Sequence, residues 1–167
     1  MDLSVVEADI VSLEVDAVVN AASRRMRGGA GVDGAIHAAA GPELLRECEE
    51  RFPDGLPTGQ AGWTHGHLLP ARWVIHVVGP NYAVGETDRR LLVSCYANAL
   101  GVADEIGAAS VAFPLVSAGA YGWPRSDAIA AAVDTLRETP TSVRSALLVA
   151  FGRGSYDEMM RYVARTA

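Results

Sequence analysis

Short runs of Val, Ile, Leu and Ala alternate along the chain with longer segments whose apolar residues recur every three or four positions. The first pattern predicts β-strands and the second predicts amphipathic helices. Strands are expected at 3–8, 16–20, 60–67, 73–78, 110–113 and 146–151. Helices are expected at 32–40, 42–52 and 88–106, from Pro124 onward, and after a capping box formed by Ser155 and Glu158. This alternation predicts an α/β layered sandwich, in which ligands bind beyond the C-terminal ends of the strands.

The size and charge of the chain narrow the classes of function. Its 167 residues suit one compact domain, residues 1–167, with a sizeable core. A formal net charge of -6 opposes nonspecific binding of nucleic acid. Cys48 and Cys95 are far apart in the sequence, and no apolar run approaches the ~20 residues that span a bilayer. We expect a soluble cytoplasmic protein with no metal, no cofactor, no membrane partner and no nucleic-acid partner.

A glycine-rich segment, residues 28–34, precedes the first predicted helix. Its last six residues, G-A-G-V-D-G, satisfy the G-x-G-x-x-G pattern of dinucleotide-binding turns. In a Rossmann fold, however, the glycines follow the first strand directly, whereas about seven residues intervene here, and Asp54, roughly 20 positions on, lies in a Pro/Gly turn. We reject a Rossmann site. The glycines still let backbone N–H groups approach a phosphate, although they could also serve only as a helix cap that allows close packing.

A second loop of small residues, 117–122, precedes the helix that Pro124 opens. If its backbone donors face those of residues 28–34, the two loops would clamp a diphosphate. Asp33 lies in the first turn of its helix, where its carboxylate would repel a phosphate, so we expect it to face a hydroxyl-bearing group such as a ribose. Asp9 and Phe151, each at the end of a strand, are candidates to accept a hydrogen bond from an exocyclic amine and to stack on a ring.

These residues belong to sequence strings that resemble the macrodomain family, particularly the MacroD-type group that reverses mono-ADP-ribosylation. The resemblance covers nearly the whole chain, and the strings occur in the family's order. They are A-D-I at 8–10, V-D-A-V-V-N-A-A at 15–22, G-G-A-G-V-D-G-A-I-H at 28–37, A-A-G at 39–41, P-T-G-Q-A at 57–61, L-P-A-R-W-V-I-H-V-V-G-P at 69–80 and F-P-L-V-S-A-G-A-Y-G-W-P at 113–124. The resemblance implies a three-layer α/β/α sandwich with a central mixed β-sheet.

The same resemblance implies a cleft for ADP-ribose. Asp9 and the Ile10 backbone would hold the adenine beside Phe151, and the two loops would clasp the diphosphate and the distal ribose. The implied ligand-binding residues are Asp9, Ile10, Asn20, Gly28, Gly29, Gly31, Val32, Asp33, Ser117, Ala118, Gly119, Ala120, Tyr121 and Phe151. The implied catalytic residues are Asp33, Asn20 and Ser23.

The activity implied by the MacroD-type group is hydrolysis of esters at the distal ribose. The enzyme would remove mono-ADP-ribose from Glu or Asp side chains and would deacetylate O-acetyl-ADP-ribose, so its partners would be ADP-ribose, its esters and mono-ADP-ribosylated proteins. Ser23 stands where the family has a second asparagine, and because serine is shorter by an amide, this change affects turnover more than binding. Two alternatives therefore stay open: a noncatalytic ADP-ribose reader and an ADP-ribose 1''-phosphatase.

Several other polar residues have simpler explanations. His65 and His67 alternate on a predicted strand, but no carboxylate or Cys accompanies them at a familiar metal-binding spacing, so we expect two solvated histidines. His37 and His76 are expected to be hydrogen-bonded structural residues. The basic run R-R-M-R at 24–27 would either attract an ADP-ribosylated acidic segment or form a solvated loop.

Overall fold

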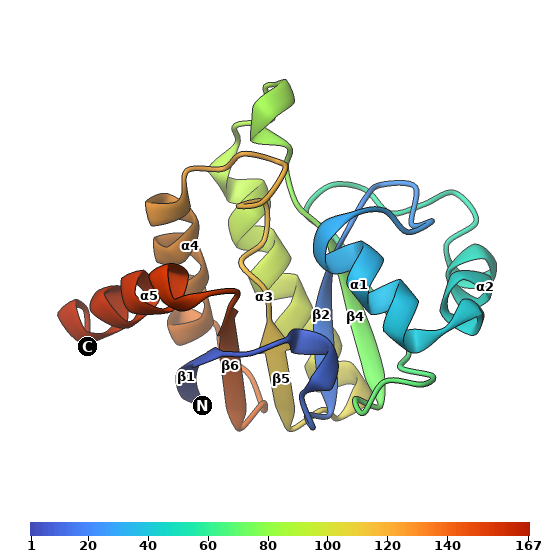
Figure 1. Cartoon of the computed structure of the whole chain (residues 1–167), viewed down its shortest axis with the longest axis horizontal. Coiled ribbons are helices and arrows are strands. Elements are labelled where there is room, and N and C mark those ends of the chain that lie inside the picture. The colour runs from blue at the N-terminus through green and yellow to red at the C-terminus, as the bar shows by residue number, and fades with distance from the viewer.

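The computed structural model describes all 167 residues, which form a six-stranded sheet with helices on both faces. The strands are β1 (Asp2–Glu7), β2 (Ala17–Ala22), β3 (Ala61–His65), β4 (Trp73–Val78), β5 (Ser110–Phe113) and β6 (Ser145–Ala150). The helices are α1 (Gly31–Ala40), α2 (Pro42–Arg51), α3 (Arg89–Ile106), α4 (Arg125–Glu138) and α5 (Arg153–Arg165), with short 3-10 turns η1 (Ile10–Ser12) and η2 (Tyr82–Val84). Figure 1 shows α1 and α2 together on the right and α4 and α5 together on the left.

The order of the strands brings their connecting loops together. The sheet runs β1-β6-β5-β2-β4-β3, and only β3 is antiparallel to its neighbour. Strand β4 reads W-V-I-H-V-V and is buried along its whole length, as is typical of a strand that is covered on both faces. Because the other strands are mutually parallel, their C-terminal ends meet along one edge of the sheet, where a ligand site is expected.

The two faces of the sheet carry separate apolar cores. Helices α3, α4 and α5 pack on the face that includes Val19, whereas α1 and α2 pack on the face that includes Val18. Neighbouring residues of β2 therefore point into opposite cores, as the pleat of a strand requires. The predicted three-layer α/β/α sandwich with a mixed sheet is confirmed.

The elements expected from the sequence are found close to their predicted places, and Pro42 occupies the first turn of α2 as expected. The predicted capping box is wrong, because α5 begins at Arg153 and its N-cap is Gly152, with φ 103°. Ser155 consequently lies inside the first turn of the helix. Strand β6 ends at Ala150, so Phe151 belongs to the connection between β6 and α5.

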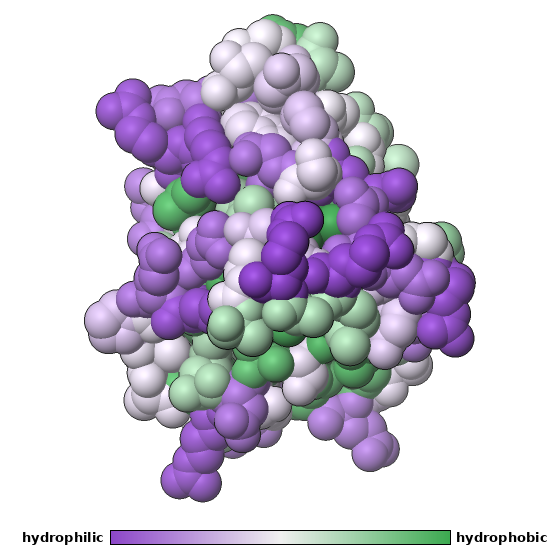
Figure 2. Space-filling view, turned by 90° about the vertical axis from the view of Figure 1, so that its left-hand side faces the viewer, coloured by the Kyte–Doolittle hydropathy of each residue, from purple (hydrophilic) through white to green (hydrophobic).

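One face of the molecule is predominantly polar (Figure 2). Figure 2 views the molecule from the side of α4 and α5, where hydrophilic residues cover most of the face and a smaller apolar area lies below its centre. None of the helices is both long enough and apolar enough to cross a membrane.

Glu47 ties helix α2 to strand β3. Its carboxylate accepts hydrogen bonds from the His65 backbone N–H at 3.0 Å and from His65 Nδ1 at 2.9 Å. It also bonds His67 Nε2 at 2.8 Å and Arg51 Nε at 2.6 Å. His65 and His67, which were predicted to be solvated, therefore both form hydrogen bonds with the Glu47 carboxylate. Burial alone would raise the pKa of Glu47, but these hydrogen bonds outweigh burial and lower the pKa to about 2.

We expect Glu47→Gln to lower the unfolding temperature at neutral pH. Because the folded-state pKa lies below the ordinary value of 4.5, the ionised carboxylate stabilises the fold above that value, and the contribution is lost as the pH falls toward 2. The cost at neutral pH is about 1–3 kcal/mol, and calorimetric melting curves should show the difference from wild type narrowing in acid. Glu50→Gln, an exposed position on α2, is the control. A difference that is constant with pH would contradict the assignment.

Candidate functional site

A cavity of about 690 Å³ opens at the edge of the sheet where the parallel strands end. Its volume lies within the range of roughly 300–1,000 Å³ that is usual for small-molecule sites. Its walls come from the loops after β1, β2, β4, β5 and β6 and from the first turns of α1, α4 and α5. The lining residues are Ala8, Asp9, Ile10, Ala21, Ala22, Ser23, Gly29, Ala30, Gly31, Val32, Asp33, Ala35, Gly79, Pro114, Leu115, Val116, Ser117, Ala118, Gly119, Ala120, Tyr121, Arg125, Val149, Phe151, Ser155 and Met159.

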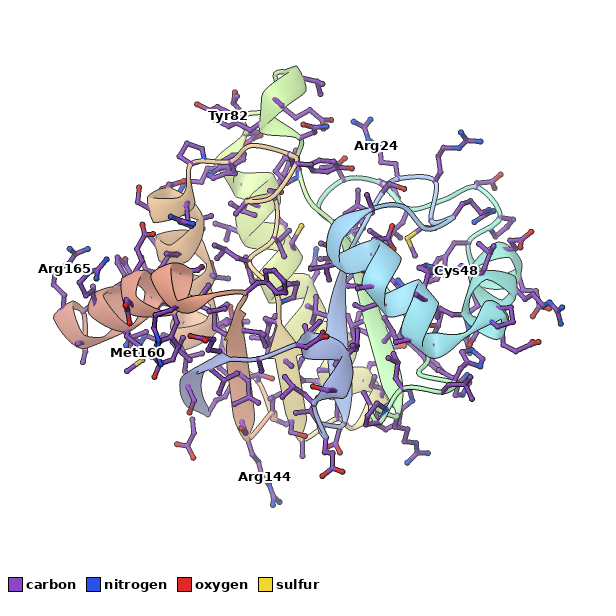
Figure 3. The ribbon with its side chains drawn as sticks, in the orientation of Figure 1. Arg24, Cys48, Tyr82, Arg144, Met160 and Arg165 are labelled. Atoms are coloured by element: carbon purple, nitrogen blue, oxygen red, sulfur yellow. The ribbon has the colours of Figure 1, made fainter.

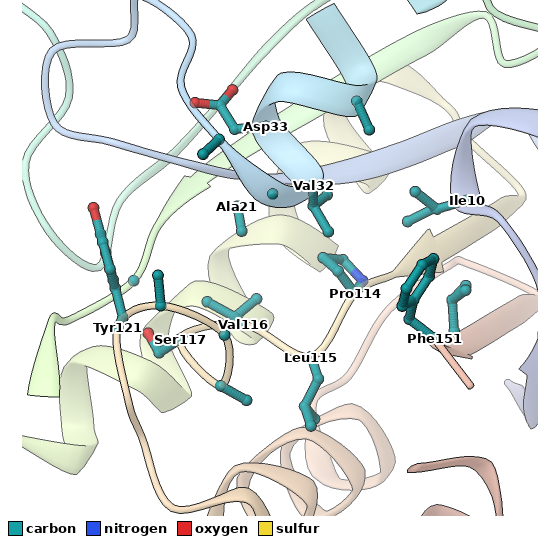
Figure 4. Close-up of a pocket in the computed structure, with 18 of the residues that line it drawn as sticks. Ile10, Ala21, Val32, Asp33, Pro114, Leu115, Val116, Ser117, Tyr121 and Phe151 are labelled. Atoms are coloured by element: carbon teal, nitrogen blue, oxygen red, sulfur yellow. The ribbon is translucent and has the colours of Figure 1, made fainter. Parts of the chain in front are cut away.

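The two ends of the cavity differ in chemistry. In Figure 4, Asp33 and Tyr121 lie toward one end, and Ile10 and Phe151 lie toward the other. Phe151 is 93% exposed, so its ring is available to stack on a ligand. Asp9 Oδ1 accepts a hydrogen bond from the Val11 backbone N–H at 3.2 Å, while Oδ2 has no partner and can accept from a ligand amine.

The first loop and the start of α1 line the cavity. Gly31, with φ 63°, begins α1, and the N-cap residue Ala30 has no side-chain hydrogen bond that would occupy the N–H groups of the first turn. The unpaired N–H groups and the positive end of a helix make a suitable site for an anion. Gly29, Ala30, Gly31 and Val32 line the cavity, so the N-terminal end of α1 lies at its wall.

Arg27 fixes the course of this first loop. Its guanidinium donates to the carbonyl oxygens of Arg25 and Met26 just before the loop and of Cys48, Phe52 and Pro53 at the C-terminal end of α2. Met26, two residues before the loop, adopts a left-handed conformation, with φ 58°, which is uncommon for a residue with a side chain. Arg24 instead forms an ion pair with Glu86, and its side chain extends away from the ribbon in Figure 3. In the basic run at 24–27, Arg27 therefore has a structural role, because its hydrogen bonds join this segment to the end of α2.

The second loop is held in a strained conformation. Ser117 has φ 65°, a conformation that costs a residue with a Cβ of order 1 kcal/mol or more and often occurs at functional sites. Its carbonyl accepts from the Trp123 N–H at 2.9 Å, and the Tyr121 carbonyl accepts from the Ala83 N–H at 2.9 Å. Ser117 Oγ is buried without a partner beside Gly79, where a Cβ would lie 2.3 Å from that oxygen. Gly79 must therefore lack a side chain for this loop to close.

Asp33 supplies the only carboxylate at its end of the cavity. Oδ1 accepts a hydrogen bond from Asn20 Nδ2 at 2.8 Å and lies 3.4 Å from His37 Nε2, while Oδ2 has no hydrogen-bond partner. Burial raises the pKa of the Asp33 carboxyl above its usual range, although the hydrogen bond from Asn20 and the nearby His37 ring oppose the rise. A buried carboxylate with one unpaired oxygen can accept a proton or orient a water molecule.

Most of the residues that the sequence assigned to the site line the cavity: Asp9, Ile10, Ser23, Gly29, Gly31, Val32, Asp33, Ser117, Ala118, Gly119, Ala120, Tyr121 and Phe151. Asn20 and Gly28 are not among its lining residues. Asn20 is fully buried and reaches Asp33 from behind, and Gly28 lies against the His37 ring. The proposed roles of these residues in ligand binding and catalysis stay predictions.

The structure adds lining residues that sequence reasoning passed over. Gly79 follows β4 directly, and a glycine at the end of a strand was the signal that could have found it. Arg125, at the start of α4, is the only cationic side chain of the lining, and its Nε bonds Glu158 of α5 at 2.9 Å. No local sequence pattern distinguishes Arg125 from other surface arginines.

No group of three or more His, Cys, Asp or Glu side chains is arranged to hold a metal ion.

Comparison with known proteins gives consistent matches. The family model described as Macro domain matches residues 19–132. A macro domain-containing protein of Streptomyces nogalater is 47% identical, with 95% of this chain and 90% of the relative covered. The O-acetyl-ADP-ribose deacetylase of Escherichia fergusonii is 48% identical, with 81% and 78% covered. A mutant macrodomain of Oceanobacillus iheyensis, solved with ADPR, superposes with a TM-score of 0.91 at 38% identity, with 98% and 92% covered.

Proposed function

Because the chain belongs to the Macro domain family, we propose that it binds ADP-ribose and hydrolyses an ester at the distal ribose. Its substrates are mono-ADP-ribose linked to Glu or Asp side chains and O-acetyl-ADP-ribose. Two comparisons support this proposal: the similar protein of E. fergusonii is named a deacetylase of O-acetyl-ADP-ribose, and the O. iheyensis macrodomain was solved with ADPR. The rest of the support comes from the chemistry of the cavity.

An ADP-ribose molecule matches the order of groups along the cavity. The adenine stacks on Phe151 and donates its amine to Asp9. The diphosphate lies between the first loop and the second loop, where backbone N–H groups neutralise its charge without a cation. The distal ribose then lies beside Asp33, whose carboxylate accepts from hydroxyl groups and would repel a phosphate.

The observation that carries the hydrolase proposal is the position of Asp33. One oxygen is held from behind by Asn20, and the other faces no protein donor. In the proposed reaction, the free oxygen, or a phosphate oxygen of the substrate, orients a water molecule and accepts its proton as the water attacks the ester. Nearby backbone N–H groups stabilise the developing negative charge. The products are ADP-ribose and the free carboxylic acid.

The same geometry bears on the two alternative functions. A 1''-phosphatase would place a second charged phosphate next to Asp33, and Arg125 is bonded to Glu158 on the α4 and α5 side of the cavity. This arrangement disfavours a phosphatase. A noncatalytic reader is supported by Ser23, which lines the cavity with a side chain shorter than the asparagine of related enzymes.

The proposal is tested by incubating the purified protein with a peptide that is mono-ADP-ribosylated on glutamate and, separately, with O-acetyl-ADP-ribose and ADP-ribose 1''-phosphate. Chromatography quantifies free ADP-ribose, and calorimetry measures its binding. Release from either ester supports the hydrolase. Binding without release identifies a reader, phosphate release identifies a phosphatase, and absence of binding overturns the assignment of ADP-ribose.

We expect Phe151→Ala to weaken ADP-ribose binding roughly 10-fold, because aromatic stacking on a base contributes ~1–3 kcal/mol. The exposed ring makes no major contribution to the core, so the unfolding temperature should stay close to that of wild type. Calorimetric titration with ADP-ribose measures the affinity, and Phe151→Trp is the matched control that keeps a stacking surface. Equal affinity of the Ala and Trp variants would exclude Phe151 as the adenine platform.

A further inference from the structure

A row of fully buried polar side chains crosses three adjacent strands behind Asp33. Asn20 comes from β2, His76 from the neighbouring β4, and Thr64 from β3 on the far side of β4. Asn20 and His76 are paired in the register of the two parallel strands. Buried polar groups in a sheet core carry a desolvation cost unless each finds a partner, so this row requires an explanation.

The contacts in this row assign the protons of the His76 ring. His76 Nδ1 lies 3.1 Å from Asn20 Nδ2, and His76 Nε2 lies 2.9 Å from Thr64 Oγ1. An amide nitrogen can only donate, so Nδ1 must be the bare, accepting nitrogen of a neutral ring. The proton of that ring is then on Nε2 and is donated to Thr64. Burial, with a smaller contribution from His37, lowers the pKa of His76 to about 3, which agrees with a neutral ring.

The same contacts account for both hydrogens of the Asn20 amide. One is donated to His76 Nδ1, and the other is donated to Asp33 Oδ1 at 2.8 Å. If the amide were turned over, its oxygen would face the bare nitrogen of His76 and the carboxylate of Asp33, which are both acceptors. The Asp33 carboxylate and a His76 ring with a bare Nδ1 are thus both satisfied by the same orientation of Asn20. The remaining oxygen, Asn20 Oδ1, is buried without a partner.

We propose that His76 is a positioning residue of the hydrolytic site: through its bare Nδ1 it fixes the Asn20 amide, which in turn holds the Asp33 carboxylate beside the distal ribose. Thr64 accepts the proton of Nε2 and so keeps it there. We call this series of hydrogen bonds, from Thr64 through His76 and Asn20 to Asp33, the relay. This role rests on the hydrolase function proposed above, because it concerns the placement of Asp33 for the reaction. It assigns no contact with the ligand to His76 itself.

The relay predicts different effects from two substitutions of similar size. In His76→Asn, the side-chain oxygen can take the place of Nδ1 and accept from Asn20, whereas in His76→Gln the polar group is displaced toward the position of Nε2 and Thr64. We expect kcat for ester release to fall roughly 10-fold in His76→Gln, in line with the loss of a buried hydrogen bond. We expect His76→Asn to recover most of that loss, with KM and the Kd of ADP-ribose within about 3-fold of wild type in both variants.

Kinetics on the glutamate-linked peptide, together with calorimetric binding of ADP-ribose, decide between these outcomes. A larger kcat for His76→Asn than for His76→Gln, at similar ADP-ribose affinity, supports the relay. Equal kcat values in the two variants, whether both low or both unchanged, would overturn it, because a purely structural histidine has no preference for an acceptor at the δ position.

A second measurement needs no catalysis and no variant of His76. Long-range proton–nitrogen NMR of the wild-type protein identifies the tautomer of the His76 ring, and we expect the proton on Nε2. In Thr64→Val, which removes the oxygen acceptor of that proton and leaves only Cys48 Sγ at 4.0 Å, a population with the proton on Nδ1 should appear. A wild-type ring with its proton on Nδ1 contradicts the proposal. If wild-type protein released no ADP-ribose, the hydrolase function would fail, while the tautomer would still decide whether His76 orients Asn20.

Discussion

Asp33→Asn is expected to lower kcat for release of ADP-ribose from glutamate by roughly 1,000-fold, within the range of general base catalysis. The asparagine has nearly the same shape and keeps an oxygen that can accept from Asn20, but it cannot accept a proton from water. The Kd of free ADP-ribose should change by less than about 5-fold, because the backbone donors and Phe151 carry most of the binding. Single-turnover kinetics on the modified peptide and calorimetry on free ADP-ribose measure the two effects separately.

The pH dependence of the reaction provides a second test of Asp33. Since burial raises its pKa, the rate should rise with pH as the carboxyl group ionises, and this acidic limb should be absent from the residual activity of Asp33→Asn. Glu43→Gln is a matched control, because Glu43 is an exposed acid in the first turn of α2 and pairs only with Arg46. If Asp33→Asn kept more than about a tenth of the wild-type rate, the water would have to be activated by a substrate phosphate or another group.

The parts of the site that the sequence predicted are those encoded locally. The glycines of the first loop, the small residues of the second loop, and Asp33 in the first turn of a helix are all visible in short sequence windows. Alternating strands and helices then place the loops that follow the strands at one edge of a parallel sheet, because each crossover helix carries the chain back to the opposite edge before the next strand begins. The layer order and the location of the cavity followed from these patterns and from the family resemblance.

The parts that the sequence could not provide depend on pairing between distant strands and helices. His76 is 56 residues from Asn20, and only the register of β2 and β4 puts the two side chains in contact. Glu47 likewise reaches His65 across the packing of α2 on β3, so spacing along the chain gave no sign of a carboxylate partner. The capping box failed for a different reason: only Phe151 and Gly152 separate the end of β6 from the start of α5 at Arg153, so Ser155 lies within the helix and cannot be its N-cap.

Gly34→Ala is expected to weaken ADP-ribose binding about 100-fold without unfolding the protein. A Cβ at this position of α1 would lie 2.5 Å from the Gly29 carbonyl oxygen. This oxygen is part of the backbone of the first loop, so it can move away only if the loop itself moves. The Gly29 carbonyl and the Ala30 N–H share one rigid peptide plane, so displacing the oxygen reorients a backbone donor of a residue that lines the cavity. Losing one or two charge-assisted hydrogen bonds to a phosphate, at ~1.5–3 kcal/mol each, accounts for the expected loss.

The stability of this variant should change much less than its affinity. Alanine is favoured over glycine inside a helix by ~1 kcal/mol, which offsets the strain of moving the first loop. Gly101→Ala is the matched control, because Gly101 also lies within a helix, α3, and its Cβ would meet no atom within 4 Å. We expect that control to keep wild-type affinity and to gain slightly in unfolding temperature. ADP-ribose affinity of Gly34→Ala within about 3-fold of wild type, measured by the same calorimetric titration, would show that the first loop does not bind the diphosphate through its backbone.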